Sequence, residues 1–187
     1  PSYFGAGSGK SSKIYMIGAL STPDPAGNIW KTDMVLANLA DQAMPVTLGF
    51  TRIGLRSTPE RPVTLTLQPG QTQRLANVIS DKWKINDATG VLTVQSAGVS
   101  GVYPVVQGES YDNSHANHYG QVMTAFTDAD AAGPGQIHYL VGLRQNADYR
   151  SQLWLFNPGT ESGSYDLVYR ALDGSILGQI KSFTVSA

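Results

Sequence analysis

Residues 32–52 read TDMVLANLADQAMPVTLGFTR, and this stretch decides the fold. It contains a nearly continuous apolar run, Met34 to Ala37, then a polar turn, and then a run in which Val46, Leu48 and Phe50 alternate with Thr and Gly. A period of two residues is typical of an antiparallel strand with one buried face, and a continuous apolar run is typical of a central strand. The stretch therefore predicts two strands of an all-β protein.

The same period and matching turn residues recur along the chain. Residues 63–67 and 165–169 alternate between apolar and polar side chains. Pro69-Gly70 fits a type II turn, and Asp173-Gly174 is a two-residue hairpin signal. Only residues 75–83 have helical spacing, which predicts a short helix that crosses from one sheet to the other. The chain is therefore predicted to be an antiparallel, immunoglobulin-like β-sandwich.

The predicted core follows from strand periodicity, with Trp83 closing one end. The strand residues expected to be buried between the two sheets are Met34, Leu36, Val46, Leu48, Phe50, Leu65, Leu67, Leu92, Val94 and Val105.

Composition excludes several classes of protein. The 187 residues are 41% hydrophobic and 14% charged, with a net charge of −1 and no cysteine. A disordered chain has low hydrophobicity and high net charge, and a nucleic-acid-binding domain has clustered Lys and Arg. Without cysteine there is no disulfide and no cysteine-ligated zinc. No apolar run approaches the roughly 18 residues of a membrane span, so neither nucleic acid nor membrane insertion is expected.

An internal repeat organises the chain. Ile14–Gly18 resembles His138–Gly142, and Trp30–Asn38 resembles Tyr149–Asn157. A strand with alternating apolar and polar residues follows in both copies, at Val46–Phe50 in the first and at Tyr165–Tyr169 in the second. The identical pairs are Tyr15/Tyr139, Gly18/Gly142, Leu36/Leu155, Asn38/Asn157, Leu48/Leu167 and Thr66/Thr184. The predicted organisation is a flexible arm over 1–12, a full sandwich unit over 13–126 and a partial second unit over 127–187.

The second copy lacks counterparts of two later strands, predicted at Val91–Gln95 and Val102–Gln107. Half a sandwich would expose an apolar sheet face and an unpaired edge. The first unit, another chain or residues beyond Ala187 would have to cover them. The expected partners are therefore other domains or copies of the same chain, and an oligomer is one expected outcome.

Four segments carry a family resemblance. They are Met34–Asn38, Pro69-Gly70-Gln71, Gly90–Ser96 and Tyr119-Gly120-Gln121. In this order they resemble a repeated β-sandwich module of bacterial secreted and cell-surface proteins. The resemblance implies a spacer, adhesion or carbohydrate-binding accessory domain, secreted or at the cell surface, and it supplies no catalytic residue.

The N-terminal stretch Phe4–Ser11 looks like a phosphate-binding loop. That motif needs Gly at the position of Phe4, a strand before the loop and a helix after it. A strand is predicted after it instead, so we expect no nucleotide binding and assign the stretch to the flexible arm.

Two clusters offer candidate metal ligands. His115 and His118 share a polar loop with Glu109 and Asp112, a set that suits a transition metal. Asp128-Ala129-Asp130 has two alternate carboxylates but lacks the Gly and distal Glu of a calcium loop. Polar loops collect such residues without a ligand, and we expect no metal and no cofactor.

Trp30 and Tyr149 begin equivalent strands, each followed by a basic residue. An exposed ring there could stack on a sugar, which leaves polysaccharide as a possible partner. Their equivalence favours a structural role at the end of each sandwich. The nearly continuous apolar run Leu153–Phe156 is typical of a central strand, and its Trp154 is expected in the core. His138 lies within another strand pattern and is expected to be half-exposed in a sheet.

The sequence thus predicts a non-enzymatic, secreted structural or adhesion module of a larger extracellular protein. Two alternatives stay open: a subunit of an extracellular filament or oligomer completed by strand addition, and a carbohydrate-binding module.

Overall fold

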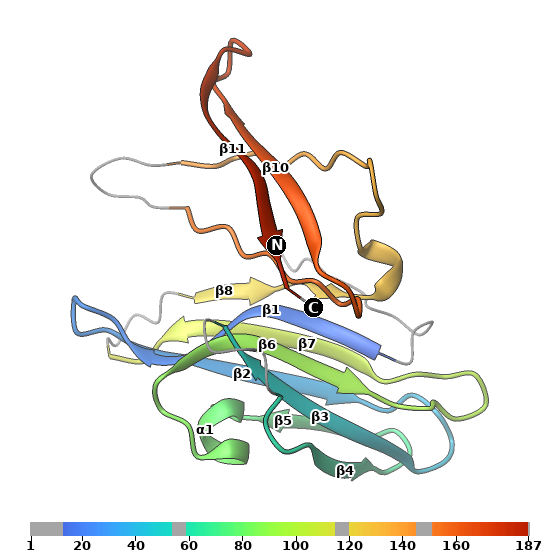
Figure 1. Cartoon of the computed structure of the whole chain (residues 1–187). Helices are drawn as coiled ribbons and strands as arrows, with labels where there is room; N and C mark the ends of the chain where they lie inside the picture. The colour runs from blue at the N-terminus through green and yellow to red at the C-terminus, as the bar shows by residue number, and fades with distance from the viewer. Residues whose placement is uncertain (1–12, 54–58, 115–119, 145–150, 187) are drawn as a thin grey trace. The chain divides into compact units, whose positions relative to one another are not determined.

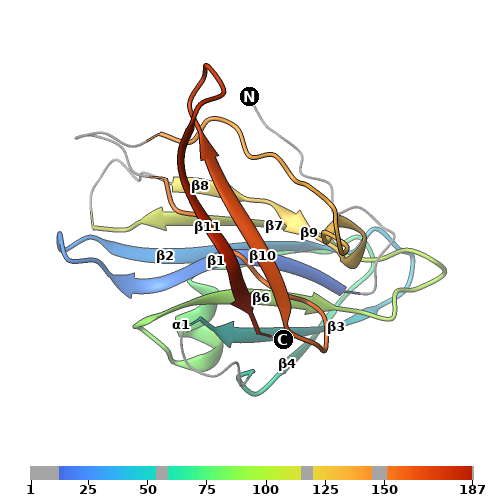
Figure 2. The same ribbon diagram turned by 45° about the horizontal axis from the view of Figure 1, so that its top comes forward.

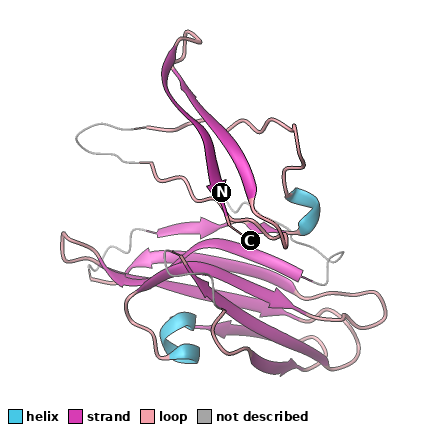
Figure 3. Cartoon of the chain, in the orientation of Figure 1, coloured by secondary structure: helices cyan, strands magenta, loops and turns pink. Residues whose placement is uncertain are grey.

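The computed structural model describes residues 13–53, 59–114, 120–144 and 151–186. The predicted arm over 1–12 lies outside these residues. Contacts divide the chain into two compact units, Pro1–Leu140 (unit 1) and Val141–Ala187 (unit 2). The predicted boundary at residue 126 comes from the repeat and stays a prediction. The described chain is all-β with antiparallel sheets, as expected, and is consistent with a β-sandwich-like class (Figure 3).

The elements follow one another in this order: β1 (Lys13–Pro23), β2 (Ile29–Ala37), β3 (Met44–Arg52), β4 (Val63–Leu67), β5 (Thr72–Leu75), α1 (Val78–Trp83), β6 (Ala88–Gln95), β7 (Val105–Asp112), β8 (Gly120–Met123), β9 (Ala125–Phe126), the 3₁₀ helix η1 (Asp128–Asp130), β10 (Gly163–Arg170) and β11 (Ile176–Val185). No helix in this described part is long or apolar enough to cross a membrane.

Unit 1 contains two sheets joined at one corner. One sheet has the order β4-β3-β6-β1, with β9 also on β1, and the other places β2 between β5 and β7, with β8 beyond β7 (Figure 1). β1 and β2 pair only at Thr22–Trp30 and Pro23–Ile29, where the chain passes from sheet to sheet. Figure 2 shows β6 lying between β1 and β3, so β6 is the interior strand that joins these two in the first sheet.

The core lies between these two sheets. The Met16 side chain on β1 packs against the backbone at Gly108 on β7, where a Cβ would overlap the Met16 methyl group. Of the ten predicted core residues, Leu65 and Val105 are only half-buried. The other eight are buried: Met34, Leu36, Val46, Leu48, Phe50, Leu67, Leu92 and Val94. The alternation of the sequence therefore located most of the core.

The prediction for β7 was wrong in its bounds. The strand predicted at Val102–Gln107 begins at Val105, because Val99 and Val102 exchange two backbone hydrogen bonds around a tight turn. Ser100 and Gly101 have φ of 52° and 78°, as a type I′ turn requires. In β7 it is Val106 that is fully buried, which is why Val105 is not.

The helix prediction is confirmed. α1 connects β5 of one sheet to β6 of the other and buries Val78 and Ile79. The Trp83 ring lies 5.7 Å from the Phe50 ring, and its Nε1–H donates to the Arg61 carbonyl oxygen at 2.8 Å. Trp83 therefore covers one end of the core, as expected.

Unit 2 contains the predicted hairpin of β10 and β11. Its loop has three residues, 172–174, rather than the two predicted, because the Ala171 N–H bonds the Ser175 carbonyl oxygen. Gly174, with φ of 86°, occupies the left-handed position of that turn.

Two other strand predictions were wrong. Residues 138–142 and Leu153–Phe156 form no strand, and Trp154, predicted in the core, is only half-buried. The matching segments of unit 1 lie in β1 and β2, which pair with β6 and β7. Residues 138–142 and Leu153–Phe156 have no such partner strands, so they form no β-ladder.

Candidate functional site

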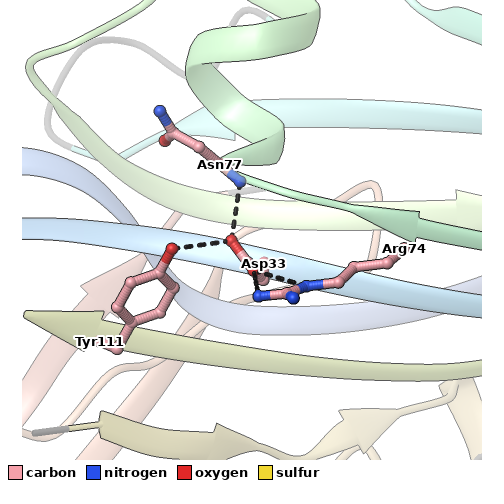
Figure 4. Close-up of polar contacts among 4 residues, drawn as sticks. All are labelled: Asp33, Arg74, Asn77 and Tyr111. Atoms are coloured by element: carbon pink, nitrogen blue, oxygen red, sulfur yellow. Dashed lines mark hydrogen bonds and ion pairs between the residues drawn. The ribbon is translucent and has the colours of Figure 1, made fainter. Parts of the chain in front are cut away.

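A buried carboxylate on β2, Asp33, is the centre of a set of polar contacts that joins several elements (Figure 4). Its Oδ2 accepts two hydrogen bonds from Arg74, from Nε at 3.0 Å and from Nη2 at 2.6 Å. Its Oδ1 accepts the backbone N–H of Asn77 at 2.7 Å and the hydroxyl of Tyr111 at 3.2 Å. We call these four residues the Asp33 cluster.

The cluster draws on four elements. Asp33 lies on β2, Arg74 on β5, Tyr111 on β7, and Asn77 is the residue before α1. Asn77 has a left-handed backbone, φ 48°, which turns its N–H toward the carboxylate. Among the described residues its Oδ1 is the one buried side-chain polar atom without a partner. The Asp33 carboxylate therefore joins the strands on both sides of β2 to the start of the helix.

The electrostatics of the cluster favour a structural role. Hydrogen bonding to Asp33 raises the pKa of Arg74, and burial, followed by the charge of Asp33, raises the pKa of Tyr111. Tyr111 thus stays protonated and donates to the carboxylate. Both Asp33 oxygens are occupied by internal donors, so the carboxylate is not placed to abstract a proton from a substrate.

The candidate transition-metal ligands are not brought together by the described structure. His115 and His118 lie outside the described residues. Asp112 is buried and accepts the N–H and the hydroxyl of Ser114, whereas Glu109 is exposed. The described ranges contain no group of three or more His, Asp or Glu side chains that could hold a metal ion.

The paired carboxylates of η1 also have internal partners. Asp128 accepts the Tyr15 hydroxyl at 2.7 Å, and Asp130 accepts the backbone N–H and the hydroxyl of Thr127. Burial, together with the hydrogen bond to Asp128, raises the pKa of Tyr15. These carboxylates hold η1 closed and fasten it to β1.

Trp30 is half-buried and is part of the β1–β2 hairpin. Its Nε1–H donates to Asp24 Oδ2 at 3.1 Å, and the amide of Asn28 donates to the same oxygen at 2.8 Å. Hydrogen bonds from Asn28, and next from Trp30, lower the pKa of Asp24. The contacts favour the structural interpretation of Trp30, while its counterpart Tyr149 lies outside the described residues.

A shallow hollow of about 450 Å³ lies beside the end of α1. Its lining residues are Glu60, Arg61, Pro62, Val63, Lys82 and Trp83. The Trp83 N–H is already bonded within the protein, so the hollow offers a ligand mainly flexible charged side chains.

The most informative geometry is repeated in the two units. Asn38 donates from Nδ2 to the carbonyl oxygens of Gln42, Leu67 and Gln68, and its Oδ1 accepts the Ala40 N–H. We call this arrangement the Asn clasp, since it ties the turn before β3 to the end of β4.

Unit 2 contains the same clasp. Asn157 donates from Nδ2 to the carbonyl oxygens of Glu161, at 2.6 Å, and Val185, at 3.4 Å. Its Oδ1 accepts the Gly159 N–H at 3.0 Å. The partners lie two and four residues after each Asn and at the last residue of the following hairpin.

Sequence reasoning found the Asn38/Asn157 identity but not the clasp, and it missed the Asp33 cluster. The available signal was a charged residue, Asp33, directly before the continuous apolar run 34–37. A carboxylate in a central strand needs buried donors, and its donors come from residues 41, 44 and 78 positions further along the chain.

The chain matches no family model and no curated protein. Two similar solved structures are a Thermotoga maritima protein, 1070, and the Anabaena sensory rhodopsin transducer. The first is 14% identical with a TM-score of 0.45, over 61% of this chain and 93% of the other. The second is 19% identical with a TM-score of 0.39, over 52% of this chain and 93% of the other.

Proposed function

We propose that this chain is a non-catalytic structural module of an extracellular protein, with one immunoglobulin-like sandwich unit and a partial second copy of it. The observation that carries the proposal is the duplicated Asn clasp. Two asparagines 119 positions apart bond equivalent backbone atoms, and Gly18 and Gly142 share a left-handed backbone with φ of 85° and 79°. Sandwich domains occur in many cell-surface proteins, and two copies of one unit fit a spacer or adhesion module.

The polar groups of the described residues support the non-catalytic part of the proposal. The buried carboxylates Asp33 and Asp112, the half-buried Asp24 and the exposed Asp130 are all engaged by donors from the protein itself. A catalytic acid or base has to face a substrate, and these face neighbouring strands and turns.

A second candidate function is assembly by strand addition. In the described part of the chain β10 pairs with β11 alone, whereas β3, its counterpart, pairs on both sides. Unpaired strand edges are templates for another chain.

A deletion and replacement experiment tests the structural role. In the organism that makes the protein, residues 13–186 are deleted in frame from the polypeptide, or replaced by an unrelated sandwich of similar length. A structural module predicts that the deletion reduces surface display or attachment while any catalysis by neighbouring domains survives. Rescue by the unrelated sandwich indicates a spacer, and failure of rescue indicates adhesion. The proposal is overturned if the purified chain catalyses a reaction by itself and the deletion abolishes that activity.

A further inference from the structure

We propose that the free edge of β10 is an acceptor site for an added β-strand, and that the strand it accepts has the side-chain pattern of β6. This inference rests on the proposed duplication, because it takes unit 1 as the template for unit 2. The occupant is an extended, uncharged segment of another polypeptide, with Gly, Leu and Val at alternate positions.

Equivalent residues of the two hairpins differ in burial in the way a missing strand predicts. Leu48 and Phe50 on β3 are both 0% exposed. Their counterparts on β10 are Leu167, which is half-buried, and Tyr169, which is 45% exposed. Both hairpins already have their second strand, β4 in one and β11 in the other. The difference therefore lies on the other side of β3, where β6 pairs.

The pairing of β6 defines what the acceptor would bind. Val94 lies opposite Leu48, Leu92 opposite Phe50, and Gly90 opposite Arg52. By equivalence, a donor Val would lie opposite Leu167, a donor Leu opposite Tyr169 and a donor Gly opposite Ala171. Leu92 and Val94 are buried in unit 1, so the donor's apolar face would supply the missing core contacts.

The glycine gives the site its selectivity. A Cβ at Gly90 would overlap the Thr51 carbonyl oxygen and the Phe50 ring. Tyr169 presents a ring at the position of Phe50, so a donor with a side chain at the glycine position would meet the same obstacle. β6 also has no charged residue between Ala88 and Gln95, as a strand placed over an apolar face requires.

Other apolar side chains of unit 2 are also exposed. Leu155 is 42% exposed although its counterpart Leu36 is 0% exposed, and Val141 is also exposed. Main-chain hydrogen bonds to the edge would supply affinity, and alternate side chains would supply specificity.

The test uses the full chain and a labelled synthetic peptide, Ala-Thr-Gly-Val-Leu-Thr-Val-Gln-Ser, which has the sequence of residues 88–96. Fluorescence anisotropy should show saturable binding with one peptide per chain. A peptide with Leu92→Asp and one with Gly90→Val should each bind at least tenfold more weakly.

Two chain variants form a matched pair, because Tyr169 and Val168 are both 45% exposed and point to opposite faces of β10. Tyr169→Lys should reduce affinity for the peptide at least tenfold, and Val168→Lys should change it less than threefold. Circular dichroism checks that both variants keep their strand content. A chain in which the peptide is fused after Ala187 through a flexible Gly/Ser linker raises the effective concentration and detects weak binding as slowed amide exchange in β10.

The proposal is overturned if neither the free nor the fused peptide protects β10, or if both lysine variants weaken binding equally. It is also overturned if the chain forms dimers through β10 that exclude the peptide, because the occupant would then be a second copy. None of these three results contradicts the structural-module proposal, because the deletion experiment tests that proposal separately.

Discussion

The two hairpins β3–β4 and β10–β11 share the Asn clasp and the register of their first pairs, yet they differ in burial. Each is preceded by an asparagine that bonds the carbonyl oxygen of the residue ending the hairpin. β3 is a central strand and carries four fully buried side chains, whereas β10 is an edge strand and carries none that is fully buried. The Asn clasp and two strands are therefore enough to form a hairpin, while the buried core of unit 1 also needs the third strand, β6.

The largest expected difference in unfolding free energy is between truncation of Leu48 on β3 and truncation of its counterpart Leu167 on β10. Leu48→Ala should lower the free energy of unfolding by about 2–5 kcal/mol, because it leaves a cavity between two sheets. Leu167→Ala removes the same atoms from a half-buried position and should cost less than about 1.5 kcal/mol. Urea unfolding followed by circular dichroism measures both, and equal losses would mean that unit 2 has a complete core.

The Asn clasp offers the next contrast. Asn38 is fully buried and satisfies three carbonyl oxygens, so Asn38→Ala should cost about 1–3 kcal/mol. Asn157 is only half-buried, water can replace its amide, and Asn157→Ala should cost less than about 1 kcal/mol. The same urea experiment compares them, and a larger loss for Asn157 would contradict the account.

The Asp33 cluster has no described counterpart in unit 2, and its removal should affect unit 1 alone. Asp33→Ala removes the acceptor of the buried Asn77 N–H and of one Tyr111 hydrogen bond, and should cost about 1–3 kcal/mol. Arg74→Lys is the control: it keeps a cation beside the buried carboxylate, and it should cost less than Asp33→Ala. Amide exchange in β5 and β7 should accelerate in the first variant, with β10 unchanged.

The smallest effect concerns pH. Burial raises the pKa of Tyr15 and of Tyr111 above that of an unfolded chain, near 10, so the folded protein favours the protonated phenols. Their contribution to stability is complete below about pH 10 and is lost as the pH rises toward the folded-state pKa values. By pH 10.5 Tyr15 should have lost about 0.8 kcal/mol, and the change at Tyr111 should have the same sign. Tyr15→Phe should flatten the decline measured by urea unfolding between pH 9 and 10.5, and an unchanged slope would refute the assignment.

The sequence predicted local features well because their causes are local. The alternation at 46–50 located buried side chains, and Pro69-Gly70 and Asp173-Gly174 located turns where Gly70 and Gly174 adopt positive φ. The start of β7 was predicted too early, at Val102, because Val102 is apolar like the strand residues that follow. In the structure Val102 pairs with Val99 across the turn at residues 99–102.

Features that depend on distant residues could not be predicted in the same way. The run Leu153–Phe156 reads as a strand as convincingly as Met34–Ala37, but only the second has partner strands on both sides. The Asp33 cluster likewise depends on residues 74, 77 and 111, which only the folded sheet brings together.

Backbone amide hydrogen exchange of the unmodified chain, compared between β3 and β10, tests the central claim most directly. The central claim is that unit 2 lacks the strand that β6 supplies in unit 1. It predicts slow exchange along the whole of β3, and in β10 fast exchange at every second amide, where no strand accepts the N–H. Uniform protection of β10 at the level of β3 would show that its edge is already covered, and would contradict the account.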